Sequence, residues 1–453
     1  MKKIYMYSFM AAMFAASLTG CGSSANTDSS ASTESTTKTS VVSEQDESIS
    51  LEKLLKKEET TEAAESAFTK RDLEQTADTS DAENITVSDG KTIDITSEGV
   101  YVISGTAEDC TIRVEADENA KVQLVLDGVS ITNSDFPAIY VVSADKVFIT
   151  TTDSENTLTV SGQFRADGET NTDAVIFSKD DLVLNGTGTL NVTSNSGNGS
   201  TCKDDMKITG GTYNVKTALD AFEANDSIAV NDGTFNITTN KDGFHCENDE
   251  AEGTITISGG TFNISGKSDG IQACALLQID GGTFDISAAE GLEATYILIN
   301  DGDIEIASND DGINVSNKSD VVGTPTVEIN GGNVAITMSG SDVDAIDANG
   351  NVIVSGGTVD ITYPQQGPSE AFDYDGTAEF SGGTIIINGN EVSEIPQGMM
   401  GGGMRGGMQG GMNGDMNGGM RGGSRGGMND GMQGRMQGGM RGEAGGFNDG
   451  TSL

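Results

Sequence analysis

The side chains best suited to chemistry are acidic residues that open one short repeated unit. The unit reads Asp or Glu, then Gly or Ala, then an apolar residue and then a polar one. Its acidic first positions are Asp220, Asp242, Asp269, Glu290, Asp311, Asp344 and Glu370. Like charges stacked about 5 Å apart repel by on the order of a kcal/mol or more per adjacent pair. Such a repeated penalty requires strong hydration or a counter-cation, and hard carboxylate oxygens are the ligands that Ca²⁺ prefers.

The acidic residues are densest where two successive units both carry additional carboxylates. These residues are Asp342, Asp344 and Asp347 in one unit and Glu370, Asp373 and Asp375 in the next. A weaker cluster consists of Asn309, Asp310, Asp311, Glu290 and Glu293. The sequence therefore predicts calcium ligands along this row. The alternative is a solvated acidic turn in which Asp-Gly only serves the bend.

Catalytic groups are few in this sequence. The single histidine, His245, stands at the polar fourth position of a unit, where it is either a general base or one more surface residue of the row. Lys179 and Lys203, which stand beside Asp pairs, are the other candidate bases. A hydrolase would use two carboxylates at a defined separation, and the row offers too many to choose between.

Repeats between residues 84 and 396 define the elements that position the acidic row. Gly-Gly-Thr and its degenerate copies recur at steps of 20 to 30 residues, a period typical of a solenoid. Apolar and polar residues alternate after each copy, as Phe262, Asn263 and Ile264 illustrate, which indicates strands. Three short strands per repeat, at roughly 24 residues each, predict a parallel β-helix of about 13 coils.

The cysteines contain no CxxC pair, so zinc and redox motifs of that kind are excluded. Cys202 and Cys246 occupy the same small slot two coils apart, roughly twice 4.8 Å, which is too far for a disulfide. Cys274 falls one position later and is expected to point the other way. We therefore expect buried free thiols.

Both ends of the chain have compositions unlike the repeats. Residues 1–20 have a short basic start and an apolar run typical of a signal peptide, and Leu18-Thr19-Gly20-Cys21 resembles the lipobox of bacterial lipoproteins, with Cys21 as the lipidated residue. Residues 21–83 are predicted to be a disordered, lipid-anchored tether, and 397–453 a flexible Gly/Met-rich tail. This organisation predicts a protein anchored by lipid on the extracellular face of the cell membrane.

The overall charge limits the classes of molecule that the protein can bind. The formal net charge is −45, which repels phosphate backbones and excludes nucleic-acid binding. The sequence has no Trp, so stacking on neutral sugar rings is confined to Tyr and Phe. An acidic protein that binds an acidic glycan requires bridging cations, which the acidic row would hold.

Three stretches carry a resemblance to a known family. The stretch 120–129 and the signatures Ser178-Lys179-Asp180-Asp181 and Lys203-Asp204-Asp205 resemble the bacterial carbohydrate-binding β-helix family of exported clostridial proteins. The resemblance covers residues 84–396. It implies a right-handed parallel β-helix that binds calcium and an acidic plant polysaccharide such as polygalacturonate, with cellulose as a further expected ligand. The architecture is also similar to that of pectin lyases. Departures from the family's Asp-Gly-Ile pattern at Asn198, Asp220-Ala221-Phe222 and Glu290-Gly291-Leu292 count against a metal at those coils.

Three functions remain open from the sequence. The first is a calcium-dependent carbohydrate-binding module, expected to be monomeric. The second is a polysaccharide lyase for pectin-type uronans, and the third is a structural or adhesive surface protein.

Overall fold

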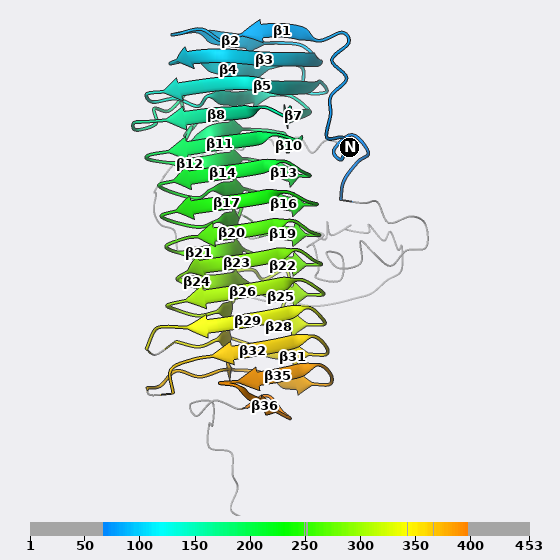
Figure 1. Ribbon diagram of the computed structural model, residues 1–453, viewed down its shortest axis with the longest axis vertical. Helices are drawn as coiled ribbons and strands as arrows, with labels where there is room; N and C mark the ends of the chain where they lie inside the picture. Colours follow the sequence, from blue (N-terminus) through cyan, green and yellow to red (C-terminus); the bar gives the residue numbers. More distant parts are fainter. Residues whose placement is uncertain (1–66, 249, 251, 342, 366, 397–453) are drawn as a thin grey trace, which may run out of the picture. The chain divides into compact units, whose positions relative to one another are not determined.

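The computed structural model is an all-β parallel β-helix in which each coil stacks on the one before it (Figure 1). It describes residues 67–248, 250, 252–341, 343–365 and 367–396. The strands form two sheets, one of 24 strands and one of 12. The 12 strands of the second sheet agree with the prediction of about 13 coils. No helix in the described part of the chain is long and apolar enough to cross a membrane.

Each coil contributes a strand to each of three ladders. The first ladder contains β1 (Glu83–Thr86), β3 (Gly99–Glu108), β5 (Lys121–Asn133), β7 (Lys146–Thr151), β10 (Asp181–Gly186), β13 (Asp205–Ile208), β16 (Ser227–Val230), β19 (Thr254–Ile257), β22 (Leu276–Ile279), β25 (Tyr296–Ile299), β28 (Thr326–Ile329), β31 (Asn351–Val354) and β34 (Ala378–Phe380). The second ladder continues from the later halves of β3 and β5 through β8 (Glu155–Val160), β11 (Thr189–Ser194), β14 (Thr212–Thr217), β17 (Thr234–Thr239), β20 (Thr261–Ser265), β23 (Thr283–Ala288), β26 (Asp303–Ser308), β29 (Asn333–Met338), β32 (Thr358–Thr362) and β35 (Thr384–Ile387). These two ladders together make the larger sheet.

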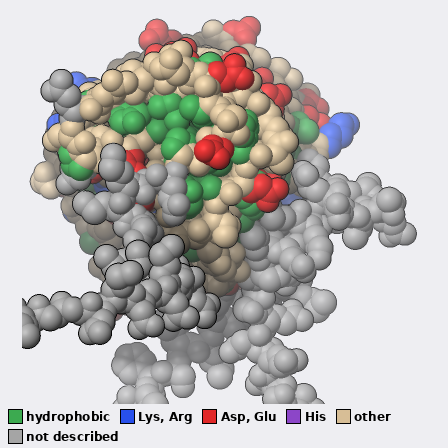
Figure 2. All heavy atoms as spheres, turned by 90° about the horizontal axis from the view of Figure 1, so that it is seen from below, with side chains coloured by type: hydrophobic (Ala, Val, Ile, Leu, Met, Phe, Trp, Pro, Cys, Tyr) green, Lys and Arg blue, Asp and Glu red, His purple; other side chains and the backbone are tan. Residues whose placement is uncertain are grey.

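The third ladder makes the smaller sheet and carries the acidic units. It contains β2 (Thr92–Ile95), β4 (Thr111–Glu115), β6 (Ile139–Ser143), β9 (Ala174–Ser178), β12 (Asn198–Cys202), β15 (Phe222–Ala224), β18 (Phe244–Cys246), β21 (Asp269–Ala273), β24 (Glu290–Ala294), β27 (Ile313–Val315), β30 (Ile346–Ala348) and β33 (Asp373–Tyr374). All named strands pair in parallel except β36 (Asn390–Val392), which turns back antiparallel on β35. Hydrophobic side chains gather on that end of the rod (Figure 2).

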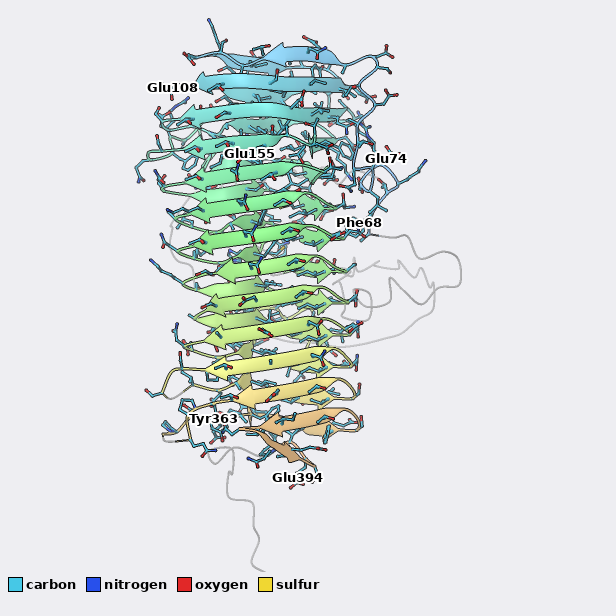
Figure 3. All side chains as sticks on the ribbon, in the orientation of Figure 1. Phe68, Glu74, Glu108, Glu155, Tyr363 and Glu394 are labelled. Atoms are coloured by element: carbon cyan, nitrogen blue, oxygen red, sulfur yellow. The ribbon has the colours of Figure 1, made fainter. Side chains whose placement is uncertain are left out.

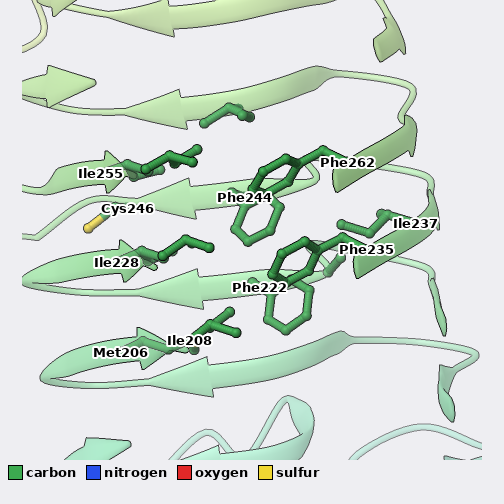
Figure 4. Close-up of a cluster of buried hydrophobic side chains, with 14 of the residues drawn as sticks. Met206, Ile208, Phe222, Ile228, Phe235, Ile237, Phe244, Cys246, Ile255 and Phe262 are labelled. Atoms are coloured by element: carbon green, nitrogen blue, oxygen red, sulfur yellow. The ribbon is translucent and has the colours of Figure 1, made fainter. Parts of the chain in front are cut away.

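The core is a narrow interior of stacked side chains, as the alternating pattern predicted. Phe262 stacks face to face between Phe235, at 4.7 Å between ring centroids, and Phe284, at 4.5 Å (Figure 4). Phe222 and Phe244 make a parallel stack at 4.9 Å. Identical residues meet because parallel, in-register coils place each side chain directly over its counterpart.

The glycine corners and the thiols both follow the repeat, and the prediction of buried free thiols is confirmed. The second glycine of the Gly-Gly-Thr corner has positive φ, for example 113° at Gly260, a conformation that glycine adopts without a steric penalty. Cys202 and Cys246 each lie beside Ala224 in the ladder, so two coils separate them. They are buried free thiols, as are the other described cysteines, Cys110 and Cys274.

The described part of the predicted tether packs against the rod. Asp72 is fully buried, and Gln75 hydrogen-bonds to the carbonyl of Thr209, which lies 134 residues away in the sequence. Residues 67–75 therefore belong to the packed structure, although they fall in the range 21–83. Cys21, residues 1–66 and the Gly/Met-rich stretch lie outside the described residues.

Replacing Phe262 with Ala should lower the free energy of unfolding by about 3–5 kcal/mol, because it empties a fully buried position between two stacked rings. Chemical unfolding followed by circular dichroism measures this change. Ser265→Ala, at an exposed position of the same strand, is the matched control and should change the value by less than about 0.5 kcal/mol. Equal effects of the two substitutions would contradict the stacked-core description.

Candidate functional site

The acidic first positions form a single column along one edge of the third ladder. Asp269 lies beside Glu290 and Asp344 beside Glu370, and the register of the intervening strands places the other acids in the same line. We call this set the acid column, and its members are Asp220, Asp242, Asp269, Glu290, Asp311, Asp344 and Glu370. The predicted alignment of these seven residues is confirmed.

The column carboxylates also hold successive coils together. Oδ1 of Asp220 accepts the backbone N–H of Asp242 at 3.0 Å, and Oδ1 of Asp242 accepts that of Asp269 at 2.9 Å. Oδ1 of Asp311 and Oδ1 of Asp344 repeat this bond, each at 2.8 Å, toward Asp344 and Glu370. One oxygen of each of these carboxylates is thereby committed to the fold, and the other is left for a neighbouring group.

Burial rules out the alternative of a fully solvated turn. Asp220, Asp242 and Asp269 are 2%, 1% and 7% exposed, and the remaining four acids of the column are half-buried. Oδ2 of Asp242 is buried without a hydrogen-bond partner. Its nearest positive charge is the Lys241 ammonium at 3.7 Å, beyond hydrogen-bond distance, and a buried oxygen of this kind is costly unless a cation or a proton neutralises it.

The pKa values of the column reflect this burial and crowding. Burial, together with the charges of Asp242 and Glu290, raises the pKa of Asp269 to about 8. Burial raises the pKa of Glu290 to about 7, with Glu293 as the next contributor. Toward the C-terminal end, burial and then Asp311 raise the pKa of Asp344 to about 6. Carboxyl groups whose charged form is disfavoured to this extent are typical of functional sites.

A second row runs beside the column at the fourth position of each unit, and we call it the polar row. Its members are Glu223, His245, Gln272, Glu293, Asn314, Asp347 and Asp373. Burial, followed by the charges of Asp311 and Asp344, raises the pKa of Asp347 to about 7. Asp347 and Asp373 are therefore placed beside the column, as the sequence predicted.

Lysines neutralise the N-terminal part of the two rows. Lys203 pairs with Glu223 at 3.0 Å, Lys241 with Asp220 at 2.8 Å and Lys318 with Glu293 at 2.8 Å. Among the described residues, no lysine or arginine forms an ion pair with Asp311, Asp344 or Asp347. The carboxylates of Asp311, Asp344 and Asp347 are therefore not neutralised by a lysine or arginine of the described residues.

Three groups of side chains have ligand atoms within 4.8 Å of one another. They are Asp220, Asp242 and His245; Asp269, Glu290 and Glu293; and Asp181, Asp204 and Asp205. The second and third groups offer only carboxylate oxygens, which are the ligands that Ca²⁺ prefers, although Lys318 pairs with Glu293 and Lys146 lies 3.4 Å from Asp181. The first includes an imidazole, and the Lys241 ammonium already lies beside Asp220, so it suits a hard cation less well.

Some predicted ligands are not brought together. Asp310 precedes the column by one position and is exposed, and Asp342 lies outside the described residues. The group expected to be densest, around Asp344, Asp347 and Asp373, is not among those with three ligand atoms inside 4.8 Å in the described part of the chain. The charge of Asp373 nevertheless contributes to the raised pKa values of Asp344 and Asp347.

The group at Asp181, Asp204 and Asp205 was missed as a candidate site. It lies where the third ladder turns into β10 and β13, at a different corner of the coil from the column. Burial, then the charges of Asp181 and Asp205, raises the pKa of Asp204 to about 7. The signal was present in the sequence as two Asp-Asp pairs one repeat apart, Asp180-Asp181 and Asp204-Asp205.

Two of the three candidate bases, His245 and Lys203, have acidic partners. Nδ1 of His245 lies 3.4 Å from Oδ2 of Asp220. Burial alone would lower the pKa of His245, but the hydrogen bond and the charge of Asp220 raise it above its usual value. The Lys203 ammonium is paired with Glu223 and lies 6.0 Å from the centre of the Phe177 ring. His245 and Lys203 therefore act as electrostatic partners of acidic residues in the column and the polar row.

The sequence belongs to a family with a defined role. The carbohydrate-binding domain-containing protein family matches residues 89–296 and 291–397, which together cover more than half of the chain. The chain therefore belongs to this family. The resemblance to carbohydrate-binding proteins is confirmed at this level, and a carbohydrate ligand follows from it.

Two individual proteins show similarity to the chain. A carbohydrate-binding domain-containing protein of Acetivibrio thermocellus is 39% identical over 127 residues, which are 27% of this chain and 44% of that relative. The match thus spans less than half of the relative's length. A solved structure described as the polysaccharide lyase-like protein from C. thermocellum, gadolinium derivative, matches 63% of this chain and 98% of its own at 25% identity, with a TM-score of 0.38.

In the absence of divalent ions, the protein should be more stable at pH 6 than at pH 8. Asp269 has a pKa of about 8 in the folded protein against 3.8 ordinarily, so between these values the folded state binds more protons and stability falls as the pH rises. The raised pKa values of Glu290 and His245 act in the same direction. Thermal unfolding in EDTA measures the effect.

Asp269→Asn should reduce this pH dependence, because it removes the group with the pKa of about 8. Asp285→Asn, at an exposed position on another face, is the matched control and should keep the slope of the parent protein. A melting temperature that rises from pH 6 to pH 8 would contradict the account of the column.

Proposed function

We propose that the protein binds acidic polysaccharide, such as polygalacturonate, through calcium ions held at the acid column and polar row. Family membership supplies the carbohydrate ligand. The net charge of −45 would repel a uronic-acid polymer, so a cation has to mediate the contact. Calcium takes six to eight oxygen ligands, which allows protein carboxylates and a glycan carboxylate to share one ion.

The observation that carries the proposal is the uncompensated stack at the C-terminal part of the rows. Burial and neighbouring carboxylates raise the pKa values of Asp311, Asp344 and Asp347, and these three residues have no ion pair with a lysine or arginine among the described residues. Asp344 uses one carboxylate oxygen in a coil-to-coil hydrogen bond, and its second oxygen and the carboxylate of Asp347 make no hydrogen bond to the part of the chain that the structure describes. A divalent ion there would replace mutual repulsion with attraction and still have coordination positions for a ligand.

Calcium ions bound at successive coils would be spaced along the rod at the distance between coils. Coils lie roughly 4.8 Å apart, a spacing set by backbone hydrogen bonds. A linear uronan lying along the column would meet carboxylates at a comparable repeat, so several weak bridges would act together. This favours a polymer over a single sugar as the ligand.

Calcium binding and glycan retention should both weaken in the double substitution Asp344→Asn and Asp347→Asn. We expect a loss of about tenfold or more in calcium affinity, since two charged ligands leave the site. Calorimetry with calcium measures the first effect, and retention on polygalacturonate with calcium and with EDTA measures the second. Asp360→Asn, on the second ladder, is the matched control.

Calcium-independent retention, or equal retention of the double variant and the control, would contradict the proposed mechanism. Appearance of the unsaturated product's absorbance, lost in Lys203→Ala, would instead identify a lyase. Absence of retention under every condition would identify a structural or adhesive role.

The cellular placement is proposed with the same function. Cys21 would carry the lipid that holds the protein on the extracellular face of the membrane, as a monomer with its rod available to glycan. We expect Cys21→Ser to move the protein from the membrane fraction to the medium in a bacterial host that processes lipoproteins. Ser23→Ala, two residues further on, is the matched control and should leave the protein in the membrane fraction. Retention of the Cys21→Ser protein in the membrane would contradict this assignment.

A further inference from the structure

The N-terminal segment 67–75 lies across the outer face of the first ladder, and we call it the strap. It runs beside the rod at the level of β7, β10 and β13, where Phe68 and Glu74 mark its two ends (Figure 3). The strap is distant from these strands in sequence and is held by side chains. It lies on the first ladder, whereas the acid column belongs to the third.

A buried carboxylate fixes the centre of the strap. Asp72 has no exposed side-chain surface, and its two oxygens lie 3.6 Å from Nζ of Lys146 and 3.5 Å from Nζ of Lys207. Oδ2 accepts the backbone N–H of Thr69 at 2.9 Å, whereas Oδ1 has no hydrogen-bond partner. Burial would raise the pKa of Asp72, but the Thr69 bond and the two lysines hold it below its usual value.

Further hydrogen bonds join the strap to the rod next to the Asp72 carboxylate. The Gln75 amide donates to the carbonyl of Thr209 at 2.9 Å and accepts the N–H of Gly186 at 3.0 Å. The Asn185 amide donates to the carbonyl of Asp72 at 3.3 Å, and the Thr209 hydroxyl donates to the same carbonyl. The strap is thus recognised by hydroxyl, amide and ammonium groups.

An aromatic ring lies beneath the strap. Phe148 alternates with the core residues Val147 and Ile149, so it faces outward, yet it is only 1% exposed. The Arg71 guanidinium covers its ring at 4.5 Å from the centroid. Val183, beside Phe148 in the ladder, is outward-facing and fully buried as well.

We propose that Phe148, Lys146, Lys207, Asn185 and Thr209 form a second binding site, for the carboxylate of a uronic-acid residue, and that Asp72 occupies it from within the chain. The inference rests on the proposed uronan ligand. An aromatic face accepts a sugar ring, two ammonium groups pair with its carboxylate, and amide and hydroxyl groups bind its hydroxyls. Because the lysines supply the positive charge, this site needs no calcium.

The geometry of Asp72 fits an exchangeable occupant. Its carboxylate meets both lysines at distances longer than a hydrogen bond, and one of its oxygens is buried without a donor. Burying an ion pair with such loose geometry yields little net stability. A glycan carboxylate free to approach both ammonium groups would compete by closing those distances.

The test uses the full-length protein in EDTA, which removes calcium and so prevents calcium-bridged binding. Asp72→Asn with Gln75→Ala should release the strap, so that trypsin cleaves after Lys70 or Arg71 faster than in the parent protein. Galacturonate oligomers should then bind more than about tenfold tighter, because a site occupied from within is available only in its open fraction. Asp81→Asn, beyond the strap, is the matched control and should change neither quantity.

Adding Lys146→Gln and Lys207→Gln to the strap variant should abolish the gain in oligomer affinity. Faster cleavage without tighter binding would overturn the proposal, since it would show an open strap and no site beneath it. Unchanged cleavage would also overturn it, since the Asp72 and Gln75 contacts would then not hold the strap. Adding Asp344→Asn and Asp347→Asn to the strap variant should leave its EDTA-resistant binding unchanged. This combination distinguishes a failure of the second site from a failure of the calcium mechanism.

Discussion

Backbone hydrogen bonding between in-register coils is the constraint on which the rest of the structure depends. It places every side chain over its counterpart one coil away, so a repeated residue becomes a continuous column. Apolar columns gain from this arrangement, as the stacked rings of Phe235, Phe262 and Phe284 show. Carboxylate columns are destabilised by the same stacking, because it buries like charges beside one another. The raised pKa values of Asp269 and Asp347 reflect this cost.

The column carboxylates have one oxygen in the fold and a second oxygen that the proposed function assigns to binding. Oδ1 of Asp242, Asp311 and Asp344 receives a backbone N–H of the next coil, so these residues are part of the fold whether or not an ion is bound. Their second oxygens create a local excess of negative charge. The last lysine that pairs with the rows is Lys318, whose partner is Glu293. The rod therefore has a part in which lysines pair with the acidic rows and a part in which, among the described residues, no lysine or arginine does.

The repeats made most of this architecture predictable, because period and alternation translate directly into ladders and columns. The acid column and the free thiols at Cys202 and Cys246 follow from counting positions. The docked strap could not be predicted, since its contacts join Asp72 to Lys207 across 135 residues and depend on no repeat. The same holds for the lysine partners of Glu223 and Glu293, whose positions depend on side-chain reach, and the Asp-Asp pairs were recognised only as family signatures.

Diffraction from crystals soaked in excess calcium, with anomalous data to identify the ions, tests the central claim most directly. The account predicts calcium peaks between the second oxygens of Asp344 and Asp347 and the neighbouring carboxylate of Asp373, with further ions along the column toward Asp269. A ridge of carboxylates that carries only water under these conditions would contradict it.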